Sequence, residues 1–169
     1  MRIAAFLFAA ALPAAAIAGP APLLSWGKPG VSLATYRADA VGCGMRAYYS
    51  DVSNTDGAKN FVEGSRRLDS YAGAPGDPME NARMMGTIVQ GTRVDASLKD
   101  VKQYQLDRDA QCLIDHGYHR FRLTDDQRKH LEKLKVGSDA RHAYLHRLAA
   151  DPEILQAQAM PDPTINAAN

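Results

Sequence analysis

Apolar residues recur at spacings of three and four along most of the chain, which is the pattern of helices with one buried face. Polar breaks rich in Gly, Pro, Asp and Ser separate these stretches. We predict helices over residues 33–50, 58–72, 78–93, 97–116, 125–136 and 139–150, with a short seventh helix starting at Asp151-Pro152. No stretch shows sustained alternation of apolar and polar residues. The pattern predicts an all-α fold, a small irregular bundle of about six to seven helices.

Capping residues support several of these boundaries. Ser32, Ser138 and Asp151 carry side-chain oxygens that can accept a hydrogen bond from the first turn of the helix that follows. Thr124 and Gln127 have the spacing of a capping box. These signals predict where four of the helices begin.

The apolar stripes also predict which side chains face the core. In the first helix we expect Tyr36, Cys43 and Ala47 to face inward, with Gly42 and Gly44 allowing another helix to approach closely. In the next two helices the expected inward residues are Phe61, Val62, Ser65, Leu68, Ala72, Ala82, Met85, Ile88 and Val89. The methionines Met79, Met84 and Met85 are interpreted as core-filling side chains.

Residues 1–18 have the pattern of a cleaved signal peptide, with a basic start, a short apolar run and Ala16-Ile17-Ala18 before Gly19. We therefore expect a periplasmic or secreted protein without a transmembrane segment after signal removal. The remaining chain divides into an extended Pro- and Gly-rich N-terminal arm over residues 19–31, a single helical domain over residues 32–160 and a flexible tail over residues 161–169. The arm is expected to bury Leu23, Leu24 and Trp26 against the domain or, alternatively, to bind a partner.

The whole chain has a formal net charge of +1, and the signal peptide contributes its only charged residue, Arg2, so the mature chain is neutral. A neutral chain shows no basic excess of the kind that binds nucleic acid. In an exported protein, the two cysteines, Cys43 and Cys112, favour one intramolecular disulfide. Two free thiols or an intermolecular bridge are the alternatives.

Histidines offer the main candidates for chemistry. His142 and His146 are one helical turn apart, a spacing that can hold zinc or copper, and a third ligand would have to come from His116, His119 or Met84. A role on a solvated helix face is the other interpretation of the pair. No local catalytic or cofactor motif is present, so we predict no catalytic residues and no cofactor. A hydrolase with a site assembled from distant residues stays open.

The segments Trp26-Gly-Lys-Pro-Gly-Val-Ser32 and Cys112-Leu-Ile-Asp-His-Gly-Tyr118, together with Cys43, resemble small uncharacterised exported helical proteins of Gram-negative bacteria with two widely spaced cysteines. The resemblance implies a periplasmic or secreted location and a disulfide. It implies no activity and no functional residues. The leading hypothesis is a binding or structural component of the cell envelope whose partner is an envelope protein or surface.

Overall fold

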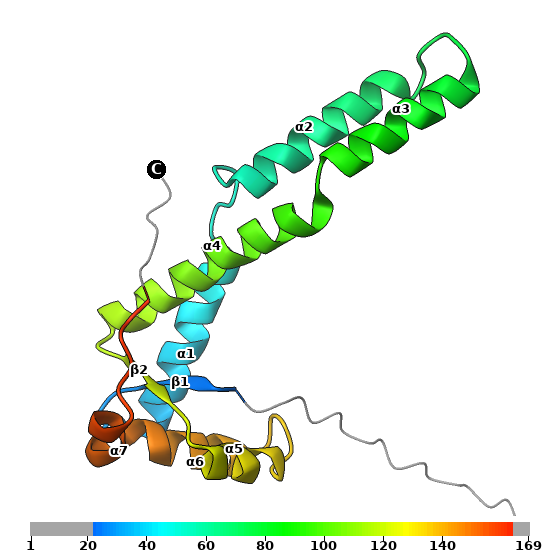
Figure 1. Cartoon of the computed structure of the whole chain (residues 1–169). Coiled ribbons are helices and arrows are strands. Elements are labelled where there is room, and N and C mark those ends of the chain that lie inside the picture. Colours follow the sequence, from blue (N-terminus) through cyan, green and yellow to red (C-terminus); the bar gives the residue numbers. More distant parts are fainter. Residues whose placement is uncertain (1–21, 164–169) are drawn as a thin grey trace, which may run out of the picture.

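The computed structural model describes residues 22–163, so the predicted signal peptide and the last part of the predicted tail lie outside the described residues. The described residues form seven helices and a two-stranded sheet (Figure 1). The helices are α1 (Leu33–Tyr48), α2 (Asp56–Tyr71), α3 (Pro78–Gly91), α4 (Val94–Asp115), α5 (Asp125–Glu132), α6 (Asp139–Ala150) and α7 (Pro152–Ala157). The all-α prediction is therefore confirmed.

The predicted caps form as expected. The Ser32 side chain accepts a hydrogen bond from the Thr35 backbone N–H at 3.1 Å, and Thr124 and Gln127 make both bonds of the capping box. Ser138 and Asp151 cap α6 and α7 in the same way. These bonds satisfy backbone donors that a helix leaves without partners in its first turn, and these four helices begin where the sequence predicts. The helices α2 and α4 begin two and three residues earlier than predicted, at Asp56 and Val94.

A small antiparallel sheet was not predicted. The strand β1 (Leu24–Gly27) pairs with β2 (His119–Arg122), and Trp26 lies opposite Arg120. Each strand has only four residues, which is too short for a pattern of alternation to be recognised. The pairing fixes part of the predicted N-terminal arm across the domain. Within that arm Trp26 packs on the core, whereas Leu23 stays 45% exposed.

The core lies at one end of the molecule, which we call the head: β1, β2, α5, α6, α7 and the ends of α1 and α4 that meet them (Figure 1). Phe121 and Leu131 are fully buried there, together with Leu123 and Leu148. A second cluster joins Val31, Cys43, Leu113 and Tyr118, and Tyr36 contacts both clusters. Arg120 donates to the Pro161 carbonyl oxygen at 3.1 Å, which holds the first residues of the predicted tail against β2.

The helices α2 and α3 form a hairpin that projects from the N-terminal end of α4, away from the head (Figure 1). At its base, Gly57 donates its backbone N–H to the Asp100 carboxylate at 2.8 Å. A Cβ atom on Gly57 would collide with the Ser97 carbonyl oxygen, and one on Gly64 would lie 2.5 Å from Thr92 Oγ1. These two glycines therefore permit the close packing of α2 on α4 and of α2 on α3.

Several expectations about individual positions are wrong. A Cβ atom on Gly42 or Gly44 would meet nothing within 4 Å, so these glycines do not serve helix approach. Val62 and Val89, expected to face inward, are 50% and 49% exposed, and the methionines Met79 and Met84 are also exposed. The reason is shared: α2 packs on α3 and α4, and α3 packs mainly on α2, so these helices leave uncovered the apolar positions that a larger bundle would bury.

Candidate functional site

The junction of α1 and α4 is held by the predicted disulfide. Cys43 and Cys112 are bonded with their Cα atoms 5.5 Å apart, and Cys43 is fully buried. The described residues contain no free cysteine. The bond closes a loop of 69 residues, and in the chain-entropy account such a loop stabilises the folded state by about 4 kcal/mol.

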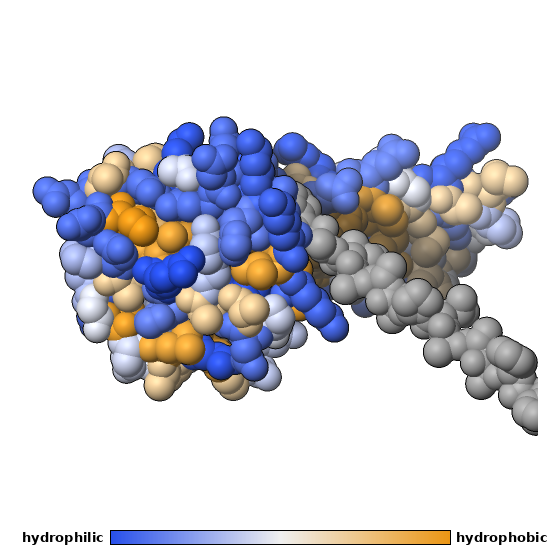
Figure 2. All heavy atoms as spheres, turned by 90° about the horizontal axis from the view of Figure 1, so that it is seen from below, coloured by the Kyte–Doolittle hydropathy of each residue, from blue (hydrophilic) through white to orange (hydrophobic). Residues whose placement is uncertain are grey.

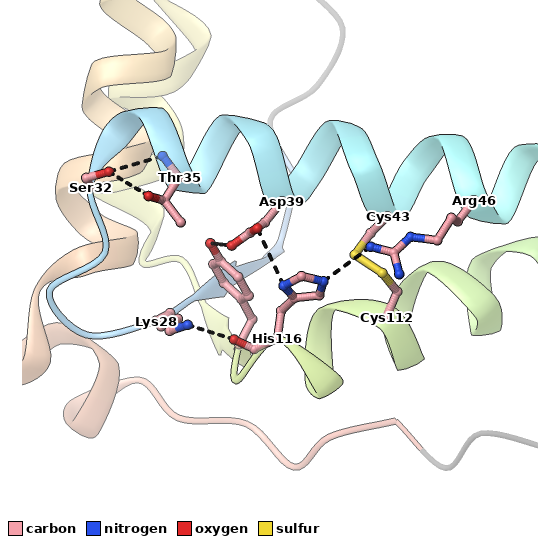
Figure 3. A network of polar contacts seen from close by, with 9 residues as sticks. Lys28, Ser32, Thr35, Asp39, Cys43, Arg46, Cys112 and His116 are labelled. Carbon is pink, nitrogen blue, oxygen red and sulfur yellow. Dashed lines mark hydrogen bonds and ion pairs between the residues drawn. A yellow bond between two sulfur atoms is a disulfide. The ribbon is translucent and has the colours of Figure 1, made fainter.

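A polar network lies beside the disulfide and centres on Asp39 (Figure 3). Its carboxylate accepts a hydrogen bond from the Tyr118 hydroxyl at 2.9 Å and lies 3.5 Å from His116 Nδ1. The other ring nitrogen of His116, Nε2, lies 3.3 Å from a guanidinium nitrogen of Arg46. Lys28 completes the network by donating to the His116 carbonyl oxygen at 2.8 Å. The network therefore links α1, the C-terminal end of α4 and the segment directly after β1.

A carboxylate beside a histidine is a common catalytic arrangement, in which the carboxylate orients the imidazole and Nε2 acts as the base. Here the group at Nε2 is the Arg46 guanidinium, which is a hydrogen-bond donor and cannot be a nucleophile. The neighbouring sulfur atoms are joined in the disulfide. Burial and the adjacent Asp39 carboxylate raise the pKa of the Tyr118 phenol, so it stays a donor at neutral pH. The arrangement fixes α1 against α4.

The predicted histidine pair does not converge on one site. On α6, His142 Nδ1 lies 3.3 Å from an Arg37 guanidinium nitrogen, and His146 Nε2 lies 2.7 Å from the Val31 carbonyl oxygen. Of the proposed third ligands, His119 contacts Asp162 and Met84 lies on α3 in the projecting hairpin. Among residues 22–163, the one cluster of three His, Cys or carboxylate groups close enough to share a metal is Cys43, Cys112 and His116. Cysteine binds a metal as the thiolate, whereas the two sulfur atoms of this cluster are bonded to each other in the disulfide. With the disulfide formed, the cluster lacks the thiolate ligands of a metal site.

The solvent face of α1 carries a stripe of large apolar side chains, which we call the α1 stripe: Val41, Met45, Tyr48 and the C-cap residue Tyr49. Their spacings of four, three and one place them on one face of the helix, opposite the face that holds Cys43 and Ala47. They are between 55% and 75% exposed. The rings of Tyr48 and Tyr49 contact each other edge to face, with centroids 5.0 Å apart.

Exposed large apolar side chains, including those of the stripe, are concentrated in residues 41–106. Among residues 22–163, eleven of the thirteen exposed large apolar residues lie in this part of the chain. We call them the apolar surface: Val41, Met45, Tyr48, Tyr49, Val62, Met79, Met84, Val89, Val94, Leu98 and Leu106. On the head, seen from below in Figure 2, hydrophobic areas are separated by hydrophilic atoms, and another hydrophobic area is visible on the more distant part to the right.

Most of this part of the chain, from Tyr48 onward, has no apolar core. Between Tyr48 and Asp109 the buried residues are Thr55, Gly57, Gly64 and Ser97, which are polar or have no side chain. Hydrophobic residues normally lie inside, and a set this large without a covering element is typical of a contact surface. Sequence periodicity could not identify it, because an apolar stripe looks the same whether another helix of the chain or a partner covers it.

No helix among the described residues combines the length and the hydrophobicity that crossing a membrane would require. Comparison of the chain with models of protein families, with curated proteins and with solved structures gives no match. The resemblance to exported proteins of Gram-negative bacteria therefore stays a prediction.

Proposed function

We propose that this protein is an exported binding component of the cell envelope, which holds a partner protein on the apolar surface of residues 41–106. The observation that carries the proposal is the distribution of apolar side chains. The head buries Phe121, Leu123, Leu131 and Leu148 and exposes Val136, whereas the segment from Tyr48 to Asp109, both included, buries no large apolar residue and exposes nine. A partner that covers this surface would supply the apolar burial that the segment lacks.

The composition of the surface favours a protein as the partner. Tyrosine and methionine are enriched in protein interfaces, where they contribute large contact areas. Tyr48, Tyr49 and Met45 lie together on α1, at the spacing with which a helix presents anchor residues to another protein. The disulfide and the Asp39 network hold the opposite face of α1, so the stripe is presented on a fixed support.

Export is the second part of the proposal and rests on two features. The first is the signal-peptide pattern of residues 1–18. The second is the Cys43–Cys112 disulfide, because such bonds persist in oxidising compartments such as the periplasm. A mass measurement on the protein purified from its source tests this directly: it should correspond to a chain beginning at Gly19 and lacking the two hydrogens lost in the disulfide.

Site-specific photocrosslinking in the producing cell tests the binding function. A photoreactive phenylalanine analogue would replace Met45 or Leu98 in the apolar surface, or Val136 in the head as a control. The three side chains are matched in exposure, at 55%, 54% and 52%. We expect both surface positions to link to the same envelope protein and Val136 to give no such product. Products that contain only a second copy of this chain, or equal products from Val136, would contradict the proposal.

Charged substitutions give a second test of the same surface. We expect Met45→Glu together with Tyr48→Glu to abolish the crosslink from Leu98, because burying two carboxylates in an apolar contact is costly. Both side chains are exposed, so the free energy of unfolding should change by no more than about 0.5 kcal/mol per site. The matched control is Val136→Glu, which should leave the crosslink intact. An unchanged crosslink in the double variant would show that α1 is not part of the contact.

A further inference from the structure

A small cavity lies between β1, α1 and α4. Its volume is about 190 Å³, and its lining includes Trp26 from β1, Tyr36 from α1, Asp109 and Leu113 from α4, and Tyr118. Since one water occupies about 30 Å³ of liquid, the cavity has room for a ligand of about six non-hydrogen atoms. Three of its seven lining residues are aromatic.

Three aromatic side chains from separate elements form its walls. The rings of Tyr36 and Tyr118 have centroids 6.1 Å apart and planes inclined at 53°, so they present non-parallel faces and edges. Trp26 is held in place by the pairing of β1 with β2. The electron-rich faces of aromatic rings attract cations, and indole does so most strongly. The Tyr118 hydroxyl is already donated to Asp39, so it is not directed to a ligand.

Asp109 is the one carboxylate in the lining. Within residues 22–163 it has neither an ion pair nor a side-chain hydrogen bond, and the lining contains no lysine or arginine. Its partial burial raises the pKa of the carboxyl group, because desolvation disfavours the charged form. Lys28 Nζ lies 5.7 Å from the centroid of the Tyr118 ring, but it does not line the cavity and forms no ion pair with Asp109. A partly desolvated carboxylate without an ion pair, beside three aromatic rings, is a site that a positive charge would complete.

We propose that this cavity binds a small alkylammonium ion, with the positive charge beside the Asp109 carboxylate and the alkyl groups against Trp26, Tyr36 and Tyr118. The lining distinguishes this ligand from a metal ion. Calcium takes six to eight oxygen ligands and magnesium takes six, whereas the cavity offers one carboxylate among rings and the apolar side chain of Leu113. Methylated ammonium groups suit such a lining, because they carry charge and bring few hydrogen-bond donors that need partners.

Trp26 makes the test direct, because it is the only tryptophan of the chain and lies in the wall of the cavity. The purified protein would be titrated with choline while the tryptophan fluorescence is recorded, at constant ionic strength. The control ligand is 3,3-dimethylbutan-1-ol, which has the shape of choline without its charge. We expect a saturable change with choline and binding of the neutral alcohol that is weaker by about tenfold or more. Equal binding of the two ligands, or no saturable change with choline, would overturn the proposal.

Variants locate the response. We expect Asp109→Asn to weaken choline binding by about tenfold or more, and Asp107→Asn on the same helix to leave it unchanged, since Asp107 accepts a hydrogen bond from Gln103 and does not line the cavity. The comparison of choline with its neutral analogue needs no variant, so a folding defect in Asp109→Asn would not remove the test. Titration with trimethyllysine amide distinguishes a free ion from a side chain of a partner: tighter binding of choline assigns the site to a free ion. Full binding by Asp109→Asn would contradict the assignment.

Discussion

Asp39 is the residue that connects most of the head to α1. Its carboxylate is reached by the Tyr118 hydroxyl and by His116 Nδ1, which come from the end of α4 and the residues after it. Its side chain is only 15% exposed, so losing a partner would leave charge poorly solvated.

We therefore expect Tyr118→Phe to destabilise the protein. The change removes one hydrogen bond to a carboxylate and keeps the buried ring, and such a bond contributes about 1.5–3 kcal/mol. The matched control is Tyr49→Phe, since Tyr49 is 75% exposed and should tolerate the change. Urea unfolding of the two variants and the parent measures the difference. A loss below about 0.5 kcal/mol for Tyr118→Phe would show that the bond contributes little.

The raised pKa of Asp109 predicts a pH dependence of folding stability that can be measured without a ligand. Between the usual carboxyl pKa and the raised pKa of Asp109, the folded protein holds a proton that the unfolded chain has released. The stability contributed by Asp109 therefore falls as the pH rises above the usual carboxyl pKa. The cavity groups facing it are the titratable Tyr36 and Tyr118 and the uncharged β1 residues, so none changes charge near neutral pH.

Asp109→Asn should accordingly be more stable than the parent at pH 7, and its advantage should shrink as the pH falls below about 4. Unfolding midpoints in urea at pH 7 and at pH 3.5 would measure this. Asp107→Asn serves as the control for removal of a charge from α4. An advantage of Asp109→Asn that is the same at both pH values would mean that the effect does not come from ionisation.

At the scale of elements, replacing either of two helical glycines with alanine should change the stability in opposite directions. Gly64→Ala should destabilise the protein by about 1–3 kcal/mol through overpacking, because its Cβ would crowd Thr92. Gly42→Ala meets open space and should stabilise by up to about 1 kcal/mol through helix propensity. Thermal unfolding of the two variants compares them. A stabilising Gly64→Ala would contradict the close packing of α2 on α3.

The helices could be predicted from the sequence because their signals are local. Ser32, Thr124 and Asp151 each sit at a helix start with a partner two or three residues away. The sheet could not be predicted, since its stability comes from pairing Trp26 with Arg120 across the chain. The candidate surface was missed for a related reason: the exposed Val62 has the same periodicity as a buried residue, and only the packing of the hairpin decides between them.

At the scale of the whole molecule, the disulfide joins two helices that are distant in sequence. Replacing both Cys43 and Cys112 with serine should reduce the free energy of unfolding by about 4 kcal/mol. Reduction of the unaltered protein should lower it by a similar amount, which separates the loss of the crosslink from the effect of serine. Urea unfolding with and without reductant provides the measurement. A loss below about 1 kcal/mol in both experiments would show that the Asp39 network alone secures the junction.

The molecule therefore has two parts with different energetics. The head is closed around Phe121 and Leu131, whereas the hairpin depends on a single seam and on packing at Gly57 and Gly64. Amide hydrogens of α2 and α3 should exchange faster than those of β1, β2 and α6, because local opening is easier where few apolar contacts are broken. These exchange rates of the free protein are the reference against which protection by a partner can be located.

Hydrogen exchange measured by mass spectrometry, on the free protein and on its complex with the envelope protein that photocrosslinking identifies, tests the central claim most directly. We expect the partner to slow exchange in peptides from residues 41–106 and to leave the head over residues 119–157 unchanged. Protection confined to the head, with residues 41–106 exchanging as in the free protein, would contradict the proposal that the exposed apolar surface is the binding surface.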